Sequence, residues 1–202
     1  MKKPTMAHSK VLLVASALLL SACAGETTSP RAARSAPLEV SKALVGVVDG
    51  VYTYTIDPNV ANTLSFGASR LSLPEHAVCN LATTSYGPAF WDQSCQSESG
   101  PVTITAVVRN ALSNNPSVEF APAMRFAPDR NVQLFLQVDN AATLSAMSRL
   151  LYCGPFSTLC VDESVNDASL RTTIDAANNT VSRRVKHFSG YTVAEFDAPP
   201  AP

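Results

Sequence analysis

Short runs of alternating apolar and polar residues recur along the chain from about residue 50, and turn-forming residues separate them. Residues 69–73 alternate strictly, with Leu71 and Leu73 on one face. Residues 131–138 place Val132, Leu134, Leu136 and Val138 on one side. A period of two is typical of a β-strand with one buried face. The strands predicted from such alternating or β-branched runs cover residues 51–56, 69–73, 102–108, 117–120, 131–138, 170–174, 180–185 and 191–196.

Helical spacing is rare in the same part of the chain. Only residues 141–151 suggest a helix, and it would be short. Many short strands with a turn about every ten residues favour an all-β antiparallel sandwich over alternating strands and helices. We expect this sandwich to occupy residues 41–196, followed by a Pro/Ala-rich tail over residues 197–202.

The N-terminus has the composition of an export signal. Lys2, Lys3 and Lys10 precede about ten apolar residues, and small residues follow. That pattern indicates a secretory signal peptide over residues 1–22, because an apolar stretch of ten is too short to cross a membrane.

The end of this segment, Leu20-Ser21-Ala22-Cys23, resembles the lipobox of bacterial lipoproteins. The resemblance implies that the chain is cut before Cys23 and that Cys23 carries a diacylglycerol and an N-acyl lipid. Residues 23–40 would then form a lipidated N-terminus and a flexible tether to the membrane. In this family an Asp after the cysteine retains the protein in the inner membrane, so Ala24 favours an outer-membrane location in the cell envelope.

The net charge argues against one class of partner. Without the three signal-peptide lysines the net charge moves from −1 to about −4. A negative chain disfavours nucleic acid, so the expected partners are the membrane, through the lipid, and a protein or other component of the envelope.

Cys79, Cys95, Cys153 and Cys160 remain once Cys23 is assigned to lipid, an even number in an oxidising compartment. Four cysteines allow three pairings, and the short intervening segments favour Cys79 with Cys95 and Cys153 with Cys160. Neither pair has zinc-site spacing, and only two histidines could help. The acidic residues 162–167 lack the EF-hand pattern and are expected to form a solvated loop, so we expect neither a metal nor another cofactor.

Familiar enzyme motifs are absent from the sequence: we find neither a Gly-x-Ser-x-Gly elbow, nor a His-Glu-x-x-His helix, nor a glycine-rich phosphate loop. His76 follows Pro74-Glu75, which suggests a loop histidine. Tyr86 and Trp91 lie with other polar and aromatic residues between Cys79 and Cys95. Such a loop suits a glycan-binding site, but we favour a lid packed over one end of the sandwich.

Three segments in order resemble a ZU5-type domain, a β-sandwich interaction module. They are residues 70–74, residues 120–128 leading into 132–136, and Val-Lys-His-Phe-Ser-Gly-Tyr at 185–191. The resemblance covers about residues 66–196. It implies a non-enzymatic interaction or envelope-structural module, which is the function that we expect.

The string His187-Phe188-Ser189 suggests an alternative. In related domains of inflammasome sensors and death-domain proteins, a His-Phe-Ser string is an autoproteolysis site. Carried over here, Ser189 would attack the carbonyl of Phe188, with His187 as a possible base. Residues two apart in a regular strand are about 7 Å apart, whereas a base must come within about 3 Å of its proton. Cleavage therefore needs a distorted backbone, and in a regular strand Phe188 would simply anchor the core.

Overall fold

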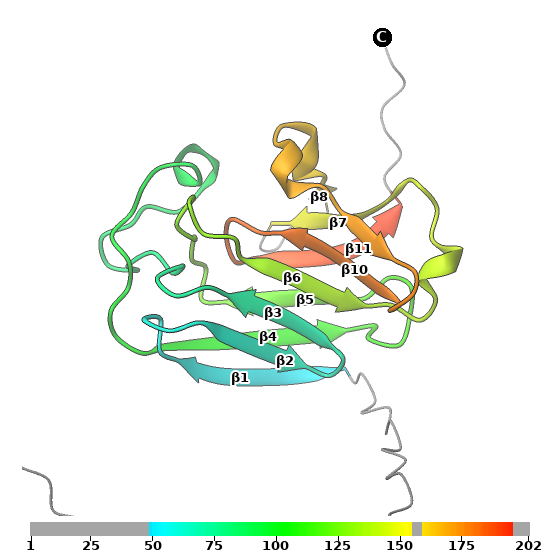
Figure 1. Cartoon of the computed structure of the whole chain (residues 1–202), viewed down its shortest axis with the longest axis horizontal. Helices are drawn as coiled ribbons and strands as arrows, with labels where there is room; N and C mark the ends of the chain where they lie inside the picture. Colours follow the sequence, from blue (N-terminus) through cyan, green and yellow to red (C-terminus); the bar gives the residue numbers. More distant parts are fainter. Residues whose placement is uncertain (1–48, 155–158, 196–202) are drawn as a thin grey trace, which may run out of the picture. The chain divides into compact units, whose positions relative to one another are not determined.

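The computed structural model describes residues 49–154 and 159–195. These residues form two antiparallel β-sheets, and the helical turns among them are short 3-10 turns. Figure 1 shows the two sheets stacked face to face. The predicted all-β antiparallel sandwich is therefore confirmed.

The first sheet has six strands in the order β1-β4-β5-β11-β7-β8. Its strand β11 forms ladders with β5 on one side and β7 on the other. The C-terminal strand is thus an inner strand of its sheet. The bounds are β1 (Gly50–Ile56), β4 (Val102–Arg109), β5 (Ser117–Ala121), β7 (Ser148–Cys153), β8 (Cys160–Val161) and β11 (Gly190–Glu195).

The second sheet has five strands in the order β2-β3-β6-β10-β9. Asn179 has a positive φ of 50° in the turn between β9 and β10. Asparagine tolerates this conformation better than most residues. The bounds are β2 (Asn62–Phe66), β3 (Ser69–Leu73), β6 (Gln133–Gln137), β9 (Thr173–Asp175) and β10 (Thr180–Arg184).

The core lies between the sheets and is filled by the alternating residues that the sequence pattern singled out. Leu71 and Leu73 on β3 and Leu134 and Leu136 on β6 are all buried. Each such side chain contributes about 1.5–3 kcal/mol by leaving water. The predicted inward faces of both strands are therefore confirmed.

The helix predicted over residues 141–151 is wrong. Asn140 caps a single 3-10 turn, η2 (Ala141–Thr143), by accepting a hydrogen bond from the amide of Ala142. The chain then enters β7, which places Leu150 in the core and pairs with β11. Burial in the sheet outweighs the weak helical preference of this segment.

Both predicted disulfides are present. Cys79 and Cys95 are joined with their Cα atoms 5.6 Å apart, and Cys153 is joined to Cys160 with a Cα separation of 4.2 Å. The first bridge closes a long loop that contains only the 3-10 turn η1 (Pro88–Phe90). The second links β7 to β8.

The signal peptide (1–22), Cys23, the tether (23–40) and the tail (197–202) lie outside the described residues. Within the described ranges, no helix has the length and apolar character needed to span a bilayer.

Candidate functional site: the crossover between the sheets

Residues 185–189, called the crossover below, connect β10 in the five-stranded sheet to β11 in the six-stranded sheet. The His187-Phe188-Ser189 string lies inside this segment. The backbone bends at Lys186 and again at Ser189. The string is therefore in irregular backbone, and the spacing of a regular strand does not apply to it.

The backbone carbonyls of the crossover have two kinds of partner. The carbonyl of Lys186 accepts from the amide of Phe126 at 2.8 Å, and the carbonyl of Ser189 accepts from the amide of Phe120 at 3.0 Å. The two carbonyls between them accept tyrosine hydroxyls instead. Tyr191 donates to the carbonyl of His187 at 2.7 Å, and Tyr86 donates to the carbonyl of Phe188 at 2.6 Å.

Phe188 holds this peptide firmly in place. Its ring is fully buried, stacks on Phe120 with centroids 4.5 Å apart, and meets Phe126 edge-on at 4.9 Å. Its amide donates to the carbonyl of Met124 at 2.7 Å. The ring thus anchors the core, and the same anchoring fixes the carbonyl that Tyr86 contacts.

Ser189 follows directly and is 5% exposed. Its hydroxyl donates to the backbone carbonyl of Cys153 at 3.1 Å. The next residue must be small, because a Cβ added to Gly190 would lie 3.0 Å from that same carbonyl oxygen. Gly190 therefore allows β11 to approach β7 closely at the point where Ser189 is held.

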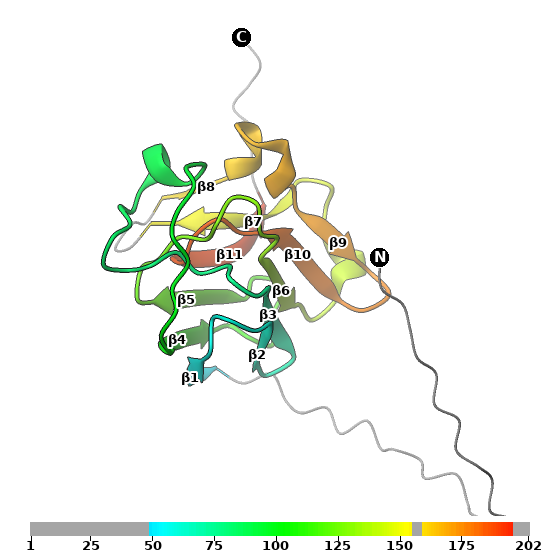
Figure 2. The same ribbon diagram turned by 60° about the vertical axis from the view of Figure 1, so that its left-hand side comes forward.

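The loop closed by Cys79 and Cys95, called the lid below, covers the crossover. Besides the Tyr86 contact, Trp91 stacks on the ring of His187 with centroids 3.8 Å apart, and Asp92 pairs with Lys186. Figure 2 shows the green turn of the lid and the golden turns of residues 163–170 on the same side of the sandwich. This arrangement corresponds to the lid expected from the sequence, and it turns Tyr86 and Trp91 toward their own chain.

His187 is fully buried and lies in a network of charged side chains. Its Nε2 is 2.9 Å from Oε1 of Glu163, and the other carboxylate oxygen of Glu163 is 2.5 Å from Arg183. Tyr152 packs edge-on against the imidazole at 4.7 Å. A carboxylate only accepts hydrogen bonds, so Nε2 is the donor in this contact.

The other ring nitrogen of His187 faces the phenol of Tyr86, with Nδ1 and the hydroxyl oxygen 3.5 Å apart. Burial raises the pKa of Tyr86 to about 12, Tyr152 and Glu163 add to this, and the Ser189 hydroxyl acts in the opposite direction. The phenol therefore stays protonated at neutral pH. One hydroxyl thus lies close to the carbonyl of Phe188, the hydroxyl of Ser189 and the imidazole of His187.

The acidic residues 162–167 are not the solvated loop that was expected. Asp162 and Glu163 are both buried, and Asp162 caps the 3-10 turn η3 (Glu163–Val165). Asp167 caps the next turn, η4 (Ala168–Leu170), and its carboxylate is 2.5 Å from Nζ of Lys186. The segment packs on the crossover because three of its carboxylates have cationic partners on the sandwich.

Lys186→Gln is expected to raise the pKa of Asp167. The hydrogen bond from Lys186 is the main reason that this pKa falls from 3.8 to about 2. A depressed pKa means that the interaction stabilises the fold above about pH 4 and is lost as the pH falls through about 2. Carboxyl NMR titration measures the shift, with Asp175, whose pKa is lowered by Asn178, as the control. A pKa of Asp167 still near 2 in the variant would contradict this assignment.

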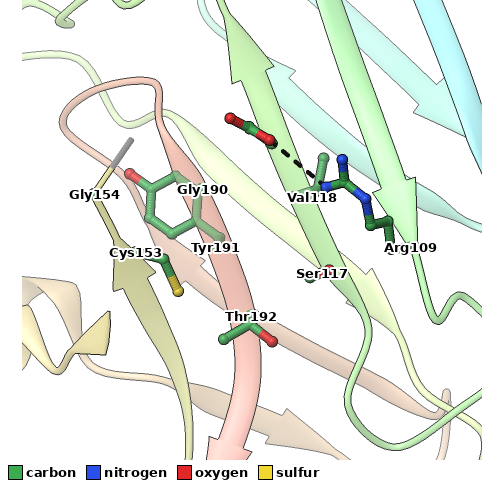
Figure 3. Close-up of a pocket in the computed structure, with 9 residues that line it drawn as sticks. Arg109, Ser117, Val118, Cys153, Gly154, Gly190, Tyr191 and Thr192 are labelled. Carbon is green, nitrogen blue, oxygen red and sulfur yellow. Dashed lines mark ion pairs between the residues drawn. The ribbon is translucent and has the colours of Figure 1, made fainter. Parts of the chain in front are cut away.

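Two cavities lie beside the crossover. One, of about 210 Å³, opens between the lid and residues 122–125 and is lined in part by Tyr86 and Met124. The other, of about 390 Å³, is lined by residues on β4, β5, β11 and β7 of the six-stranded sheet and includes the Arg109–Glu119 ion pair (Figure 3). It is lined by Arg109, Ser117, Val118, Glu119, Cys153, Gly154, Gly190, Tyr191 and Thr192.

The remaining candidates from the sequence lie elsewhere. His76 is in a turn with a positive φ of 56°. Among the described residues, no group of three or more His, Cys, Asp or Glu side chains is arranged to hold a metal ion. The sequence pattern did not link Glu163 or Tyr86 to His187. Glu163 is 24 residues from His187 in the sequence and Tyr86 is 101 residues from it, so no local signal points to either contact.

A scan against models of known protein families found no family that matches this chain. A search of the curated proteins likewise found no match.

Proposed function

We propose that this chain is a lipid-anchored protein of the cell envelope whose β-sandwich cleaves itself between Phe188 and Ser189. The observation that carries the proposal is the hydrogen bond from Tyr86 to the carbonyl of Phe188, next to the buried hydroxyl of Ser189. A donor aimed at a carbonyl oxygen stabilises the negative charge that develops there when the carbon is attacked. The lipid at Cys23, which the lipobox implies, would tether the domain to the membrane.

The proposed reaction begins with attack of Ser189 Oγ on the carbonyl carbon of Phe188. A C–O bond forms in a five-membered ring, and the serine hydroxyl proton passes to the amide nitrogen. The C–N bond then breaks, which leaves an ester between Phe188 and Ser189 and a free amine on Ser189. Water hydrolyses the ester to the carboxylate of Phe188 and the free hydroxyl of Ser189, and the cavity beside Tyr86 provides room for it.

Two side chains of the crossover and two that contact it have roles in this scheme. Ser189 is the nucleophile, and its attack is intramolecular, so no substrate has to bind from solution. Tyr86 donates to the carbonyl oxygen. Nδ1 of His187 lies 3.5 Å from the Tyr86 hydroxyl oxygen, and Glu163 orients the imidazole by accepting from Nε2. This is the acid–imidazole arrangement by which a base is oriented in hydrolases.

Ser189→Ala tests the proposal. The wild-type chain is expected to give two species by mass spectrometry under denaturing conditions, the smaller being the fourteen residues from Ser189 to Pro202. Ser189→Ala should remain intact because it lacks the nucleophile. Ser148→Ala, which alters another buried serine, is the matched control and should be cleaved like the wild type.

A single wild-type species of full mass, unchanged by Ser189→Ala, would refute self-cleavage. In that event the function proposed from the sequence, a non-enzymatic interaction or envelope-structural module, would stand in its place.

A further inference from the structure

Three consecutive residues of the crossover contact the lid. Lys186 pairs with Asp92, His187 stacks on Trp91, and the carbonyl of Phe188 accepts from Tyr86. All three lid residues lie between Cys79 and Cys95, which are joined. The hydroxyl that contacts the proposed scissile carbonyl therefore belongs to a disulfide-closed loop.

The lid has little regular structure of its own. Its described residues include one 3-10 turn, and Leu81 and Tyr86 are 42% and 37% exposed. Near one end, the amide of Asn80 donates to the carbonyl of Gln96 at 2.8 Å, beside the disulfide. The other end is held by Arg125, whose guanidinium donates to the carbonyls of Phe90 and Ser94 at 2.8 and 3.3 Å. Tyr86 lies between these two attachments.

We infer that cleavage at Phe188–Ser189 requires the Cys79–Cys95 disulfide, so that the chain cuts itself only in an oxidising compartment. This inference rests on the proposed function. The thiols of Cys79 and Cys95 give up two electrons and two protons to a disulfide oxidant such as oxidised glutathione, which becomes two thiols. The bridge that forms holds the lid closed and Tyr86 against the carbonyl.

The expected effect is large because the loop is long. The two cysteines are separated by 16 residues. Without the cross-link, a loop of this size has many more open conformations, and this lowers the population of its closed form about 100-fold. The contacts that Arg125 and Lys186 make with the lid keep a fraction of the reduced protein in the closed form. The reduced protein is therefore expected to cleave between about 10-fold and 100-fold more slowly than the oxidised protein.

The second disulfide provides a matched control. Cys153 also contributes to the site, but through its backbone carbonyl, which accepts from Ser189. That carbonyl is positioned by the ladder between β7 and β11, where Cys153 is opposite Gly190. Cys160→Ser opens this bridge while leaving Cys153 in place, so it should leave the cleavage rate within about 3-fold of the wild type, well inside the effect expected for the first bridge.

The experiment folds the full chain from its reduced, denatured state in oxidised glutathione or in dithiothreitol, and follows the fourteen-residue fragment by denaturing mass spectrometry. Cleavage in the oxidised sample alone supports the requirement. Equal rates in both samples overturn it and leave self-cleavage standing. Intact protein in both samples refutes the proposed function, and the requirement with it.

Cys79→Ser with Cys95→Ser repeats the test without reductant, and near-ultraviolet circular dichroism reports whether this variant keeps its tertiary packing. A folded variant that cleaves at the wild-type rate overturns the requirement. If the variant unfolds, Cys79→Ala with Cys95→Ala repeats the measurement, because Cys79 is buried and a small apolar side chain suits its site. Slower cleavage by the folded alanine variant then supports the requirement, and a wild-type rate contradicts it.

Discussion

Tyr86→Phe is expected to slow cleavage of the Phe188–Ser189 bond about 100-fold while the domain stays folded, because one donor to a developing oxyanion is worth about 100-fold to 1000-fold in rate. The lost hydroxyl donates to the carbonyl of Phe188 at 2.6 Å. The cost in stability should be only about 1 kcal/mol, since the ring and its packing are kept. Time courses of fragment formation by mass spectrometry measure the rate.

Tyr152→Phe is the control, because Tyr152 packs against the same imidazole but through its ring. Its cleavage rate should match that of the wild type. The pH profile separates a chemical role from a structural one. With a pKa raised to about 12 by burial, Tyr86 keeps its proton well past the ordinary tyrosine value of 10, so wild-type cleavage should not decline as the pH passes 10. Wild-type rates in Tyr86→Phe would rule out the assigned role.

Glu163→Ala is expected to destabilise the domain by about 3–5 kcal/mol and to lower its Tm by about 10 °C. The carboxylate of Glu163 pairs with Arg183, whose side chain is fully buried. Removing it leaves a cation in the core with two backbone carbonyls, those of Leu150 and Arg184, as its remaining acceptors among the described contacts. Differential scanning calorimetry and urea unfolding measure the change.

Glu119→Ala serves as the comparison for this variant. Glu119 also pairs with an arginine, Arg109, but both side chains are more than half exposed. Exposed pairs contribute about 0–1 kcal/mol. Similar losses of unfolding free energy in the two variants would show that the buried Glu163–Arg183 pair stabilises the domain no more than an exposed pair does.

The period-two pattern predicted the fold well where one face of a strand is buried. Residues 131–138 and 69–73 were assigned correctly, because the alternation of Leu134, Leu136, Leu71 and Leu73 follows directly from the pleat of a strand. The strand β7 was missed because its apolar residues follow the alanine-rich segment at 141–147, which has helical spacing. Its pairing with β11, a neighbour about forty residues away, decides its conformation, and no local pattern encodes that.

The candidate site was predictable only in part. The spacing of Cys79 and Cys95 predicted the disulfide, and the His187-Phe188-Ser189 string directed attention to the crossover, whose role as a site stays a prediction. Glu163 was assigned to a solvated loop because acidic residues beside a turn are usually exposed. Its burial depends on meeting both Arg183 and His187, which occurs only after the sheets have stacked.

The inner position of β11 has a thermodynamic consequence. If the chain is cut before Ser189, the ladders with β5 and β7 hold the resulting fragment. Unfolding then becomes a dissociation into two molecules, whereas the uncut domain unfolds as one. By mass action the melting temperature of the cut form should rise with protein concentration, and that of Ser189→Ala should not. At high dilution the cut domain would lose its last strand, so its lifetime would depend on its local concentration.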